Sequence, residues 1–370
     1  LAGFSGISRI LCYVTIISRH DVNRNNITKT ILFWTTMFGD KNFYFGSADP
    51  FAKCPVNNCY ATSNKSYMDI VDFDAMLFHG NEMRNWPSRR SLQQWYVYVN
   101  LESPEHRKVP AKLSRDYFNL TMTYRLDSDI VWSYAVVKDI RTNEIVAPLV
   151  NTTWQPYENR VSLKLSKIIR GKEKAVSWIV SNCKAKSGRE AYVKELSKHI
   201  EVDVYGKCGP FKCSRSTDCH GKLVEPRYFF YLSFENSLCR DYVTEKLYDA
   251  LRYNTIPIVY GGANYSIFAP AKSYIDALDF NVPEDLAKYL KFLMRNPEEY
   301  AKYFAWKNYY YIDRDGVRAE CRLCAFLHQK TEPKSYKSLS DWYAEDVCPI
   351  QRIVSDHRYA TKANLAVSVN

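Results

Sequence analysis

The chain has 370 residues, which exceeds the usual size of a single hydrophobic core roughly twofold and so predicts two packed domains. Lysine and arginine outnumber aspartate and glutamate by 51 to 40, which gives a net charge of +11. This charge favours an anionic partner, such as nucleic acid, an acidic membrane surface or a phosphorylated small molecule. The alternative is that the basic residues merely solvate the surface. The longest early apolar run, residues 11–17, is far shorter than the roughly 20 residues that cross a bilayer, so a membrane anchor would have to precede this chain.

Short runs rich in β-branched and aromatic residues follow one another along the chain, and amphipathic helical patterns separate the later ones. The strand-like runs are residues 30–36, 75–80, 94–102, 175–182, 200–206, 228–235 and 256–262. The helical patterns are residues 188–199, 241–254 and 283–310. This alternation predicts an α/β protein with βαβ units around two parallel sheets, divided near residues 150–170, where proline and polar residues break the pattern.

The helical pattern at 241–254 lies between two apolar runs and carries a Glu-Lys pair. We expect Asp241 to be its N-cap and Tyr242 its first residue. One face, formed by Val243, Leu247, Ala250 and Leu251, should cover the sheet, and Tyr242, Glu245, Lys246 and Asp249 should point away. A helix that starts at the carboxyl edge of a parallel sheet attracts phosphate, although a Glu-Lys pair is also common on solvated helices. No glycine-rich nucleotide-binding motif accompanies it.

Eleven cysteines and five N-x-S/T sequons favour an oxidising, glycosylating compartment. The sequons are Asn26, Asn64, Asn119, Asn151 and Asn264. Zinc is the alternative for two cysteine clusters, one formed by Cys321, Cys324 and His328 and the other by Cys213, Cys219 and His220, but neither has the two spaced ligand pairs of a structural zinc site. Disulfides are therefore the preferred interpretation, with a connectivity that spacing does not reveal.

Several ordered blocks resemble one family. The stretch "FENSLCRDYVTEKLYDAL", followed by "PIVYGGANY" and "SYIDALDF", is similar to the donor-binding signature of the α1,3-fucosyltransferases, glycosyltransferase family 10. The blocks "VNLESPEH", "FNLTMTYRLDSDI", "WIVSNCKAKSGREAYVKELSKHIEVDVYGKCG" and "CRLCAFLH" match further parts of that family in the same order. The similarity covers most of residues 30–345, and "YGKCGPFKCSRS" resembles invertebrate members, including enzymes that modify the N-glycan core.

The resemblance implies a GT-B fold, with two facing Rossmann-like domains and a cleft between them. Residues 1–29 would be a stem or anchor remnant, 30–165 the acceptor-side domain, 166–330 the GDP-fucose domain and 331–370 a C-terminal segment. The implied reaction is the inverting transfer of L-fucose from GDP-β-L-fucose to O3 of N-acetylglucosamine on a glycoprotein N-glycan. Such a displacement needs a carboxylate to accept the proton and cations to stabilise the leaving diphosphate.

Site residues follow from the matched motifs. Glu102 corresponds to the general base, and Arg189 and Lys246 to the groups that hold the diphosphate. Glu245 would accept hydrogen bonds from the ribose, and the pocket would be completed by Ser181, Asn182, Tyr242 and Asn236. Arg125 is expected to order the cleft. The resemblance also pairs Cys54 and Cys59 with Cys321 and Cys324, with local bridges as the alternative. The sequence departs from vertebrate Lewis-type members after "FENS", where Leu238 and Cys239 follow, and Cys239 would tether the turn beside the donor by a disulfide.

The resemblance extends to cofactor, partners and location. Three D-x-D triplets begin at residues 72, 127 and 313, but triplets this short arise by chance, and the family needs no metal for its chemistry. We therefore expect no essential cofactor, although Mn²⁺ could stimulate the reaction. The expected location is the Golgi lumen, on a type II membrane protein. A nucleic-acid-binding role lacks a matching motif. An inactive, glycan-binding relative is the alternative, and whether the acceptor is core or antennal stays open.

Overall fold

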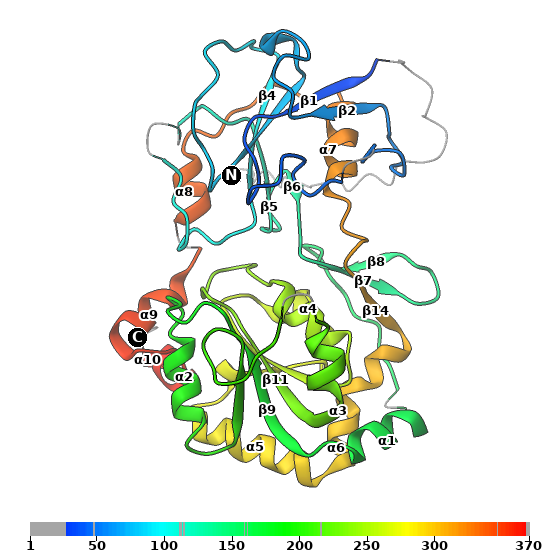
Figure 1. Cartoon of the computed structure of the whole chain (residues 1–370), viewed down its shortest axis with the longest axis vertical. Coiled ribbons are helices and arrows are strands. Elements are labelled where there is room, and N and C mark those ends of the chain that lie inside the picture. Colours follow the sequence, from blue (N-terminus) through cyan, green and yellow to red (C-terminus); the bar gives the residue numbers. More distant parts are fainter. Residues whose placement is uncertain are drawn as a thin grey trace, which may run out of the picture.

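The computed structural model describes residues 27–46, 49–110, 113, 115–158, 160, 162–214, 217–345 and 347–367. The predicted stem and the sequon at Asn26 therefore fall almost wholly outside the described residues. Figure 1 shows two lobes, one above the other, with a small sheet between them on one side and a C-terminal segment on the other. No helix among the described residues is long and apolar enough to span a bilayer.

The first lobe is built on a parallel sheet. Within the described residues its six strands have the order β2-β1-β3-β4-β5-β6, and every neighbouring pair is parallel. The strands are β1 Lys29–Phe33, β2 Cys59–Thr62, β3 Ala75–His79, β4 Trp95–Asn100, β5 Leu120–Thr123 and β6 Ile130–Val131. The predicted strands at 30–36, 75–80 and 94–102 are confirmed.

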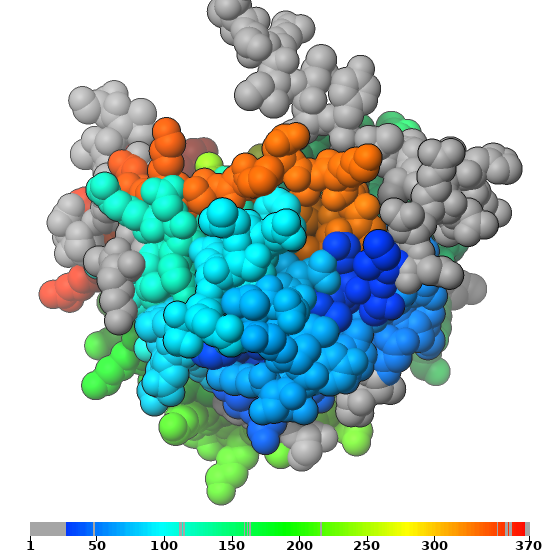
Figure 2. All heavy atoms as spheres, turned by 90° about the horizontal axis from the view of Figure 1, so that it is seen from above, coloured from blue at the N-terminus to red at the C-terminus, as the bar shows by residue number. Residues whose placement is uncertain are grey.

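Both faces of this sheet are buried, because successive side chains of a strand point to opposite sides. Ile31 and Leu77 belong to one core and Leu32 and Met76 to the other. The described connections between these strands contain no α-helix, unlike the predicted βαβ units. Instead α7 (Ala319–Leu327) covers the first face and α8 (Leu339–Ala344) the second. Figure 2 shows this orange segment lying against the blue and cyan lobe.

The second lobe holds the other parallel sheet, with the order β10-β9-β11-β12-β13. Its strands are β9 Lys174–Ile179, β10 Val202–Tyr205, β11 Tyr228–Phe234, β12 Ile256–Tyr260 and β13 Ile275–Asp276. One face packs against α2, α5 and α6, and the other against α4. The helices of this lobe are α1 Leu163–Arg170, α2 Arg189–Leu196, α3 Glu225–Arg227, α4 Glu245–Leu251, α5 Pro283–Arg295, α6 Pro297–Ala301, α9 Pro349–His357 and α10 Lys362–Val367.

Between the lobes lies an antiparallel sheet with the order β14-β7-β8. It consists of β7 Val136–Asp139, β8 Ile145–Ala147 and β14 Tyr310–Asp313. The helical pattern predicted for 283–310 therefore resolves into α5, α6, a 3₁₀ segment at Lys302–Asn308 and the first residue of β14. The chain passes from one lobe to the other along β6–β7, along β14–α7 and again between α8 and α9 (Figure 1).

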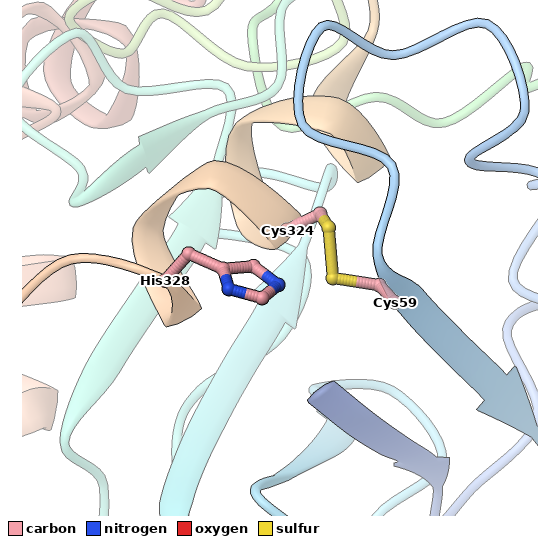
Figure 3. A group of neighbouring side chains, drawn as sticks. All are labelled: Cys59, Cys324 and His328. Atoms are coloured by element: carbon pink, nitrogen blue, oxygen red, sulfur yellow. A yellow bond between two sulfur atoms is a disulfide. The ribbon is translucent and has the colours of Figure 1, made fainter. Parts of the chain in front are cut away.

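The described residues contain five disulfides: Cys54–Cys321, Cys59–Cys324, Cys183–Cys208, Cys213–Cys219 and Cys239–Cys348. The pairing of the C-terminal cysteines with the first lobe is confirmed, as is a tether on the turn at Cys239. The zinc alternative is wrong for both clusters, because a sulfur in a disulfide is no thiolate ligand. Figure 3 shows His328 beside the Cys59–Cys324 bridge, and its Nε2 lies 2.9 Å from the carbonyl oxygen of Asn58.

Candidate active site at the lobe contact

Glu102 follows β4 by two residues, at the carboxyl edge of the first sheet. Its backbone N–H donates to Asn100 Oδ1 at 3.0 Å, and its carbonyl accepts a hydrogen bond from the Tyr343 hydroxyl. The preceding carbonyl, that of Leu101, accepts from the Tyr134 hydroxyl at 2.6 Å. With its backbone held in this way, the Glu102 carboxylate reaches the other lobe, where Oε2 accepts a hydrogen bond from Tyr242 at 3.3 Å.

The turn formed by residues 102–106, which we call the Glu102 turn, rests directly on the second lobe. Ser103 Oγ donates to Ser237 Oγ at 2.7 Å, and both residues are fully buried. Lys186 Nζ donates to the carbonyl of Glu105 at 2.5 Å and lies 3.5 Å from its carboxylate. The first lobe therefore presents the Glu102 turn to the second lobe near the end of β11 and the beginning of α2.

The start of α4 differs from the prediction. The helix begins at Glu245 rather than Tyr242, and Asp241 is not its N-cap. Asp241 has a φ of 59°, outside the helical range, and its carboxylate accepts the backbone N–H of Leu126 from the first lobe at 3.2 Å. Tyr242 is also buried, at 1% exposure, and does not point to solvent, because its ring packs edge-on against Tyr124 of the first lobe.

A buried carboxylate that the motifs did not single out holds this corner together. Glu235, which is 1% exposed, follows β11 and accepts both the backbone N–H and the hydroxyl of Thr244, at 2.8 and 2.9 Å. Lys246 Nζ lies 3.0 Å from Glu235 and 3.2 Å from Glu245. Burial raises the pKa of Glu235. Burial disfavours the charged lysine too, but the two carboxylates outweigh it and raise the pKa of Lys246 to about 12.

Lys246 is thus a fixed cation rather than the mobile one expected from an exposed helix face. It also outweighs the burial of Glu245 and lowers the pKa of that carboxyl group. Its side chain is mostly buried, with 22% of its surface exposed. The corner therefore offers a permanently charged donor beside the phenol that contacts Glu102.

Arg189 opens α2, as predicted, but it is only 3% exposed. Its guanidinium donates to the carbonyls of Phe234 and Asn182 at 2.8 Å each, and to Glu190 at 3.2 Å. These bonds join the end of β11 to the loop after β9. Arg189 therefore orders the second-lobe edge of the site. Its positive charge lies close enough to Lys246 to act against the rise in the pKa of that lysine.

The remaining predicted donor residues lie on the loops at this edge. Ser181 and Asn182 are exposed directly after β9, and the Cys183–Cys208 disulfide ties their loop to the end of β10. Asn236 follows Glu235, and its backbone carbonyl accepts the N–H of Ser187 at 3.2 Å.

Of the eight predicted site residues, Glu102 and Tyr242 meet directly across the lobes. Lys246 pairs with Glu245, and Arg189 contacts the carbonyl of Asn182, on the second-lobe side. Ser181 and Asn236 lie on loops at the same edge of the second sheet.

A cavity of about 1150 Å³ opens beside this contact, and none of the predicted donor residues lines it. Leu101 and Tyr134 form the wall nearest Glu102, and Tyr44, Phe45 and Trp132 add aromatic surface. Residues 312–315, 317 and 318, in the connection between the lobes, also line it. The cavity therefore adjoins the residues that support Glu102 but includes neither Lys246 nor Glu235.

Arg125 orders the first lobe, as expected. Its guanidinium pairs with Asp127 at 2.6 Å, donates to the carbonyl of Trp342 and lies 4.0 Å over the indole ring of Trp342. The D-x-D carboxylates serve similar internal contacts: Asp129 pairs with Lys334, and Asp313 lies 2.8 Å from Lys138. In the described residues, the groups close enough to hold a metal ion each contain two cysteines that form a disulfide.

Two facing lobes of parallel sheet, with a carboxylate from one and a fixed cation from the other at their contact, define a glycosyltransferase of the GT-B class. Residues 26–135 match the family described as "Fucosyltransferase, N-terminal", and residues 169–342 match "Glycosyltransferase family 10 (fucosyltransferase) C-term". The chain therefore belongs to glycosyltransferase family 10, the fucosyltransferases, and is an enzyme of that family.

Relatives and solved structures agree with this assignment. Alpha-(1,3)-fucosyltransferase C of Drosophila melanogaster is 39% identical over 334 residues, which are 85% of this chain and 78% of the relative. Glycoprotein 3-alpha-L-fucosyltransferase A of the same organism is 39% identical over 79% of this chain and 56% of its own length. A crystal structure of an α1,3-fucosyltransferase with GDP-fucose is similar in fold, with a TM-score of 0.50 and 15% identity over 86% of this chain and 96% of that chain.

Proposed function

We propose that this enzyme transfers L-fucose from GDP-β-L-fucose, with inversion, to O3 of an N-acetylglucosamine on a glycoprotein glycan. The observation that carries the proposal is the contact between Glu102 and Tyr242 at 3.3 Å, which places a first-lobe carboxylate beside the second-lobe cation corner. The linkage named for the two Drosophila relatives supports the α1,3 linkage, and the similar crystal structure with GDP-fucose supports the donor.

In the proposed reaction, O3 of the acceptor attacks C1 of fucose while the bond from C1 to the diphosphate breaks. Glu102 takes the O3 proton as general base, and the electron pair of the broken bond leaves with GDP. Lys246 neutralises the diphosphate directly, and buried Arg189 adds positive charge at the same edge. Glu245 would hold the ribose, with Ser181, Asn182, Tyr242 and Asn236 around the nucleotide. The aromatic cavity beside Leu101 and Tyr134 suits the acceptor sugar.

The test uses purified protein, GDP-fucose and a panel of defined core and antennal N-glycans, with the added sugar located by mass spectrometry. Glu102→Gln should lower the rate on the order of 10²- to 10⁴-fold while GDP binding is retained. Glu144→Gln, which alters an exposed glutamate in the connection between β7 and β8, is the matched control. Glycans that stay unmodified but bind equally to wild type and Glu102→Gln would identify a glycan-binding protein instead.

We also propose that the enzyme works in the lumen of the Golgi apparatus. Five disulfides among the described residues form and persist in oxidising compartments. The sequons at Asn64, Asn151 and Asn264 are exposed, as glycosylation requires, and Asn119 is partly buried. Attachment to the membrane as a type II protein stays a prediction. Treating the secreted protein with N-glycanase and measuring the mass change would test glycosylation.

A further inference from the structure

The C-terminal segment crosses from one lobe to the other beside the candidate site. Figure 1 shows α8 against the first lobe and α9 near the second. The chain between these helices contains Cys348, which is bonded to Cys239 in the turn after β11. Tyr343 lies in α8 and Gln351 in α9, one on each side of this bridge. Both lie beyond residue 342, where the family match ends, so no matched motif gives either of them a role.

Tyr343 fixes the backbone of the carboxylate residue. Its hydroxyl donates to the carbonyl of Glu102, and burial raises the pKa of Tyr343 well above its usual value, so the phenol stays a donor. The fully buried ring packs edge-on against Tyr98 of β4, with 5.3 Å between the ring centroids. On the other side of Glu102, Asn100 accepts its backbone N–H at 3.0 Å. The N–H and the carbonyl of Glu102 are therefore held by two different elements, β4 and α8.

Gln351 holds two turns of the second lobe with one side-chain amide. Its Oε1 accepts the backbone N–H of Leu238 at 3.1 Å, and its Nε2 donates to the carbonyl of Lys186. The first contact lies in the turn between Glu235 and α4, and the second lies just before Arg189 opens α2. The amide thus joins the two stretches of chain that carry the charged groups of the second-lobe edge.

The 238–240 turn is bonded to the C-terminal segment at three consecutive residues. Gln351 accepts the N–H of Leu238, Cys239 forms the disulfide, and the N–H of Arg240 donates to the carbonyl of Val347 at 2.6 Å. A turn held at every residue has little freedom to move apart from the segment. One short stretch of chain therefore connects the backbone of Glu102 at one end with the loops of the second-lobe edge at the other.

We propose that Tyr343 and Gln351 are positioning residues, in that Tyr343 fixes the general base and Gln351 fixes the loops that receive the donor. The proposal rests on the proposed function, in which Glu102 takes the proton and the second-lobe edge holds GDP-fucose. A base displaced by about 1 Å can lose on the order of 10²-fold in rate, so the Tyr343 contact affects the chemical step. The Gln351 contacts lie on the second-lobe side, so they affect the affinity for the nucleotide instead.

The test measures two quantities in each variant: the single-turnover rate of fucose transfer at saturating GDP-fucose, and the Kd for GDP by calorimetry. Tyr343→Phe removes only the hydroxyl and should lower the rate about 3- to 30-fold while the Kd stays within about twofold of wild type. Gln351→Met keeps the length of the side chain without its hydrogen bonds. It should raise the Kd about 3- to 10-fold while the rate at saturation stays within about twofold.

Tyr300→Phe is the matched control for the loss of a buried hydroxyl. Tyr300 is also fully buried, and its hydroxyl donates to the carbonyl of Phe229 at 2.6 Å, near the end of β11 that is opposite to the site. This variant should lower the melting temperature about as much as Tyr343→Phe but change neither rate nor Kd. Gln329→Met, at an exposed residue after α7, is the control for Gln351→Met.

The separation of the two effects decides the proposal. A Tyr343→Phe enzyme that loses stability but keeps its rate would overturn it, as would variants that change rate and Kd together, because either result describes purely structural residues. If one variant does not fold, the other still tests its own half. If wild type transfers no fucose, the proposed function fails instead, and the Kd of Gln351→Met for GDP still tests the donor half.

Discussion

Replacing Lys246 by Met should destabilise the second lobe in a pH-dependent way that is separable from its effect on the donor. The ammonium group lies 3.0 Å from Glu235, which is 1% exposed and keeps only the N–H and hydroxyl of Thr244 once the lysine is gone. Removing one partner of a buried ion pair costs about 3 to 5 kcal/mol. Because Thr244 still donates to Glu235 and Lys246 is partly exposed, we expect roughly 2 to 3 kcal/mol.

The pH dependence follows from the carboxyl group that remains. Burial raises the pKa of Glu235, and Lys246 is the strongest influence that opposes this rise. When an acid has a higher pKa in the folded state than in the unfolded state, the folded protein becomes less stable as the pH rises from the unfolded-state pKa to the folded-state pKa. Without Lys246 that window extends upward, so the penalty of Lys246→Met should be small near about pH 5 and complete near about pH 8.

Thermal unfolding followed at both pH values measures the effect. For a lobe of this size, the expected free-energy loss lowers the melting temperature by roughly 5 to 10 °C at the higher pH. The double variant Glu235→Gln/Lys246→Met should recover most of this loss, because no buried charge is left, but it should not recover GDP affinity. Lys288→Met, which breaks an exposed pair with Glu284 on α5, is the control and should leave melting nearly unchanged. An equal penalty at both pH values, or no recovery in the double variant, would refute the reasoning.

Four further predictions concern the site and its supports. Cys348→Ser opens the bridge to Cys239, which joins residues 109 positions apart in the chain. The loss should lower the free energy of unfolding by about 2 to 5 kcal/mol and raise the KM for GDP-fucose, and an unchanged melting temperature would contradict this prediction. Tyr242→Phe removes the hydrogen bond to Glu102 and should lower kcat roughly 2- to 10-fold in steady-state kinetics, so a far larger loss would give Tyr242 another role. Arg189→Lys gives up a forked donor that spans two backbone carbonyls and should weaken GDP binding in calorimetry, whereas wild-type affinity would count against it. Chelator should leave the fucosylation rate unchanged, and a rate lost in EDTA and restored by Mn²⁺ would reverse that expectation.

Local patterns predicted the second lobe well. Strands β9 to β12 and α2 appear within a few residues of the predicted ranges, because buried parallel strands are long apolar runs and Arg189 begins an amphipathic pattern. The short edge strand β13 was not predicted. The start of α4 was misplaced for a tertiary reason. The backbone N–H and the hydroxyl of Thr244 donate to Glu235, and the carboxylate of Asp241 accepts the backbone N–H of Leu126. Asp241 is therefore not available as the N-cap that the local sequence predicts.

The helices of the first lobe and part of the site required long-range information. Nothing in residues 29–131 indicates that α7 and α8 will cover that sheet; only the family resemblance connected Cys321 and Cys324 with this lobe. Glu235 looked like the polar end of a buried strand, and a carboxylate directly after seven buried residues was the one local signal of its role. Tyr134 carried no local signal, because the carbonyl that its hydroxyl supports, that of Leu101, lies 33 residues earlier in the chain.

The late position of α7 and α8 also sets an order of assembly during synthesis. When residues 29–131 leave the ribosome, the helices that cover the two faces of their sheet have not yet been made, because α7 and α8 lie within residues 319–344. The second lobe, whose strands and packing helices are neighbours in the chain, can fold first, as segments with local contacts generally do. The apolar faces of the first sheet therefore stay uncovered until residues 319–344 have been translated, and a premature stop before residue 319 would leave an aggregation-prone sheet rather than half an enzyme.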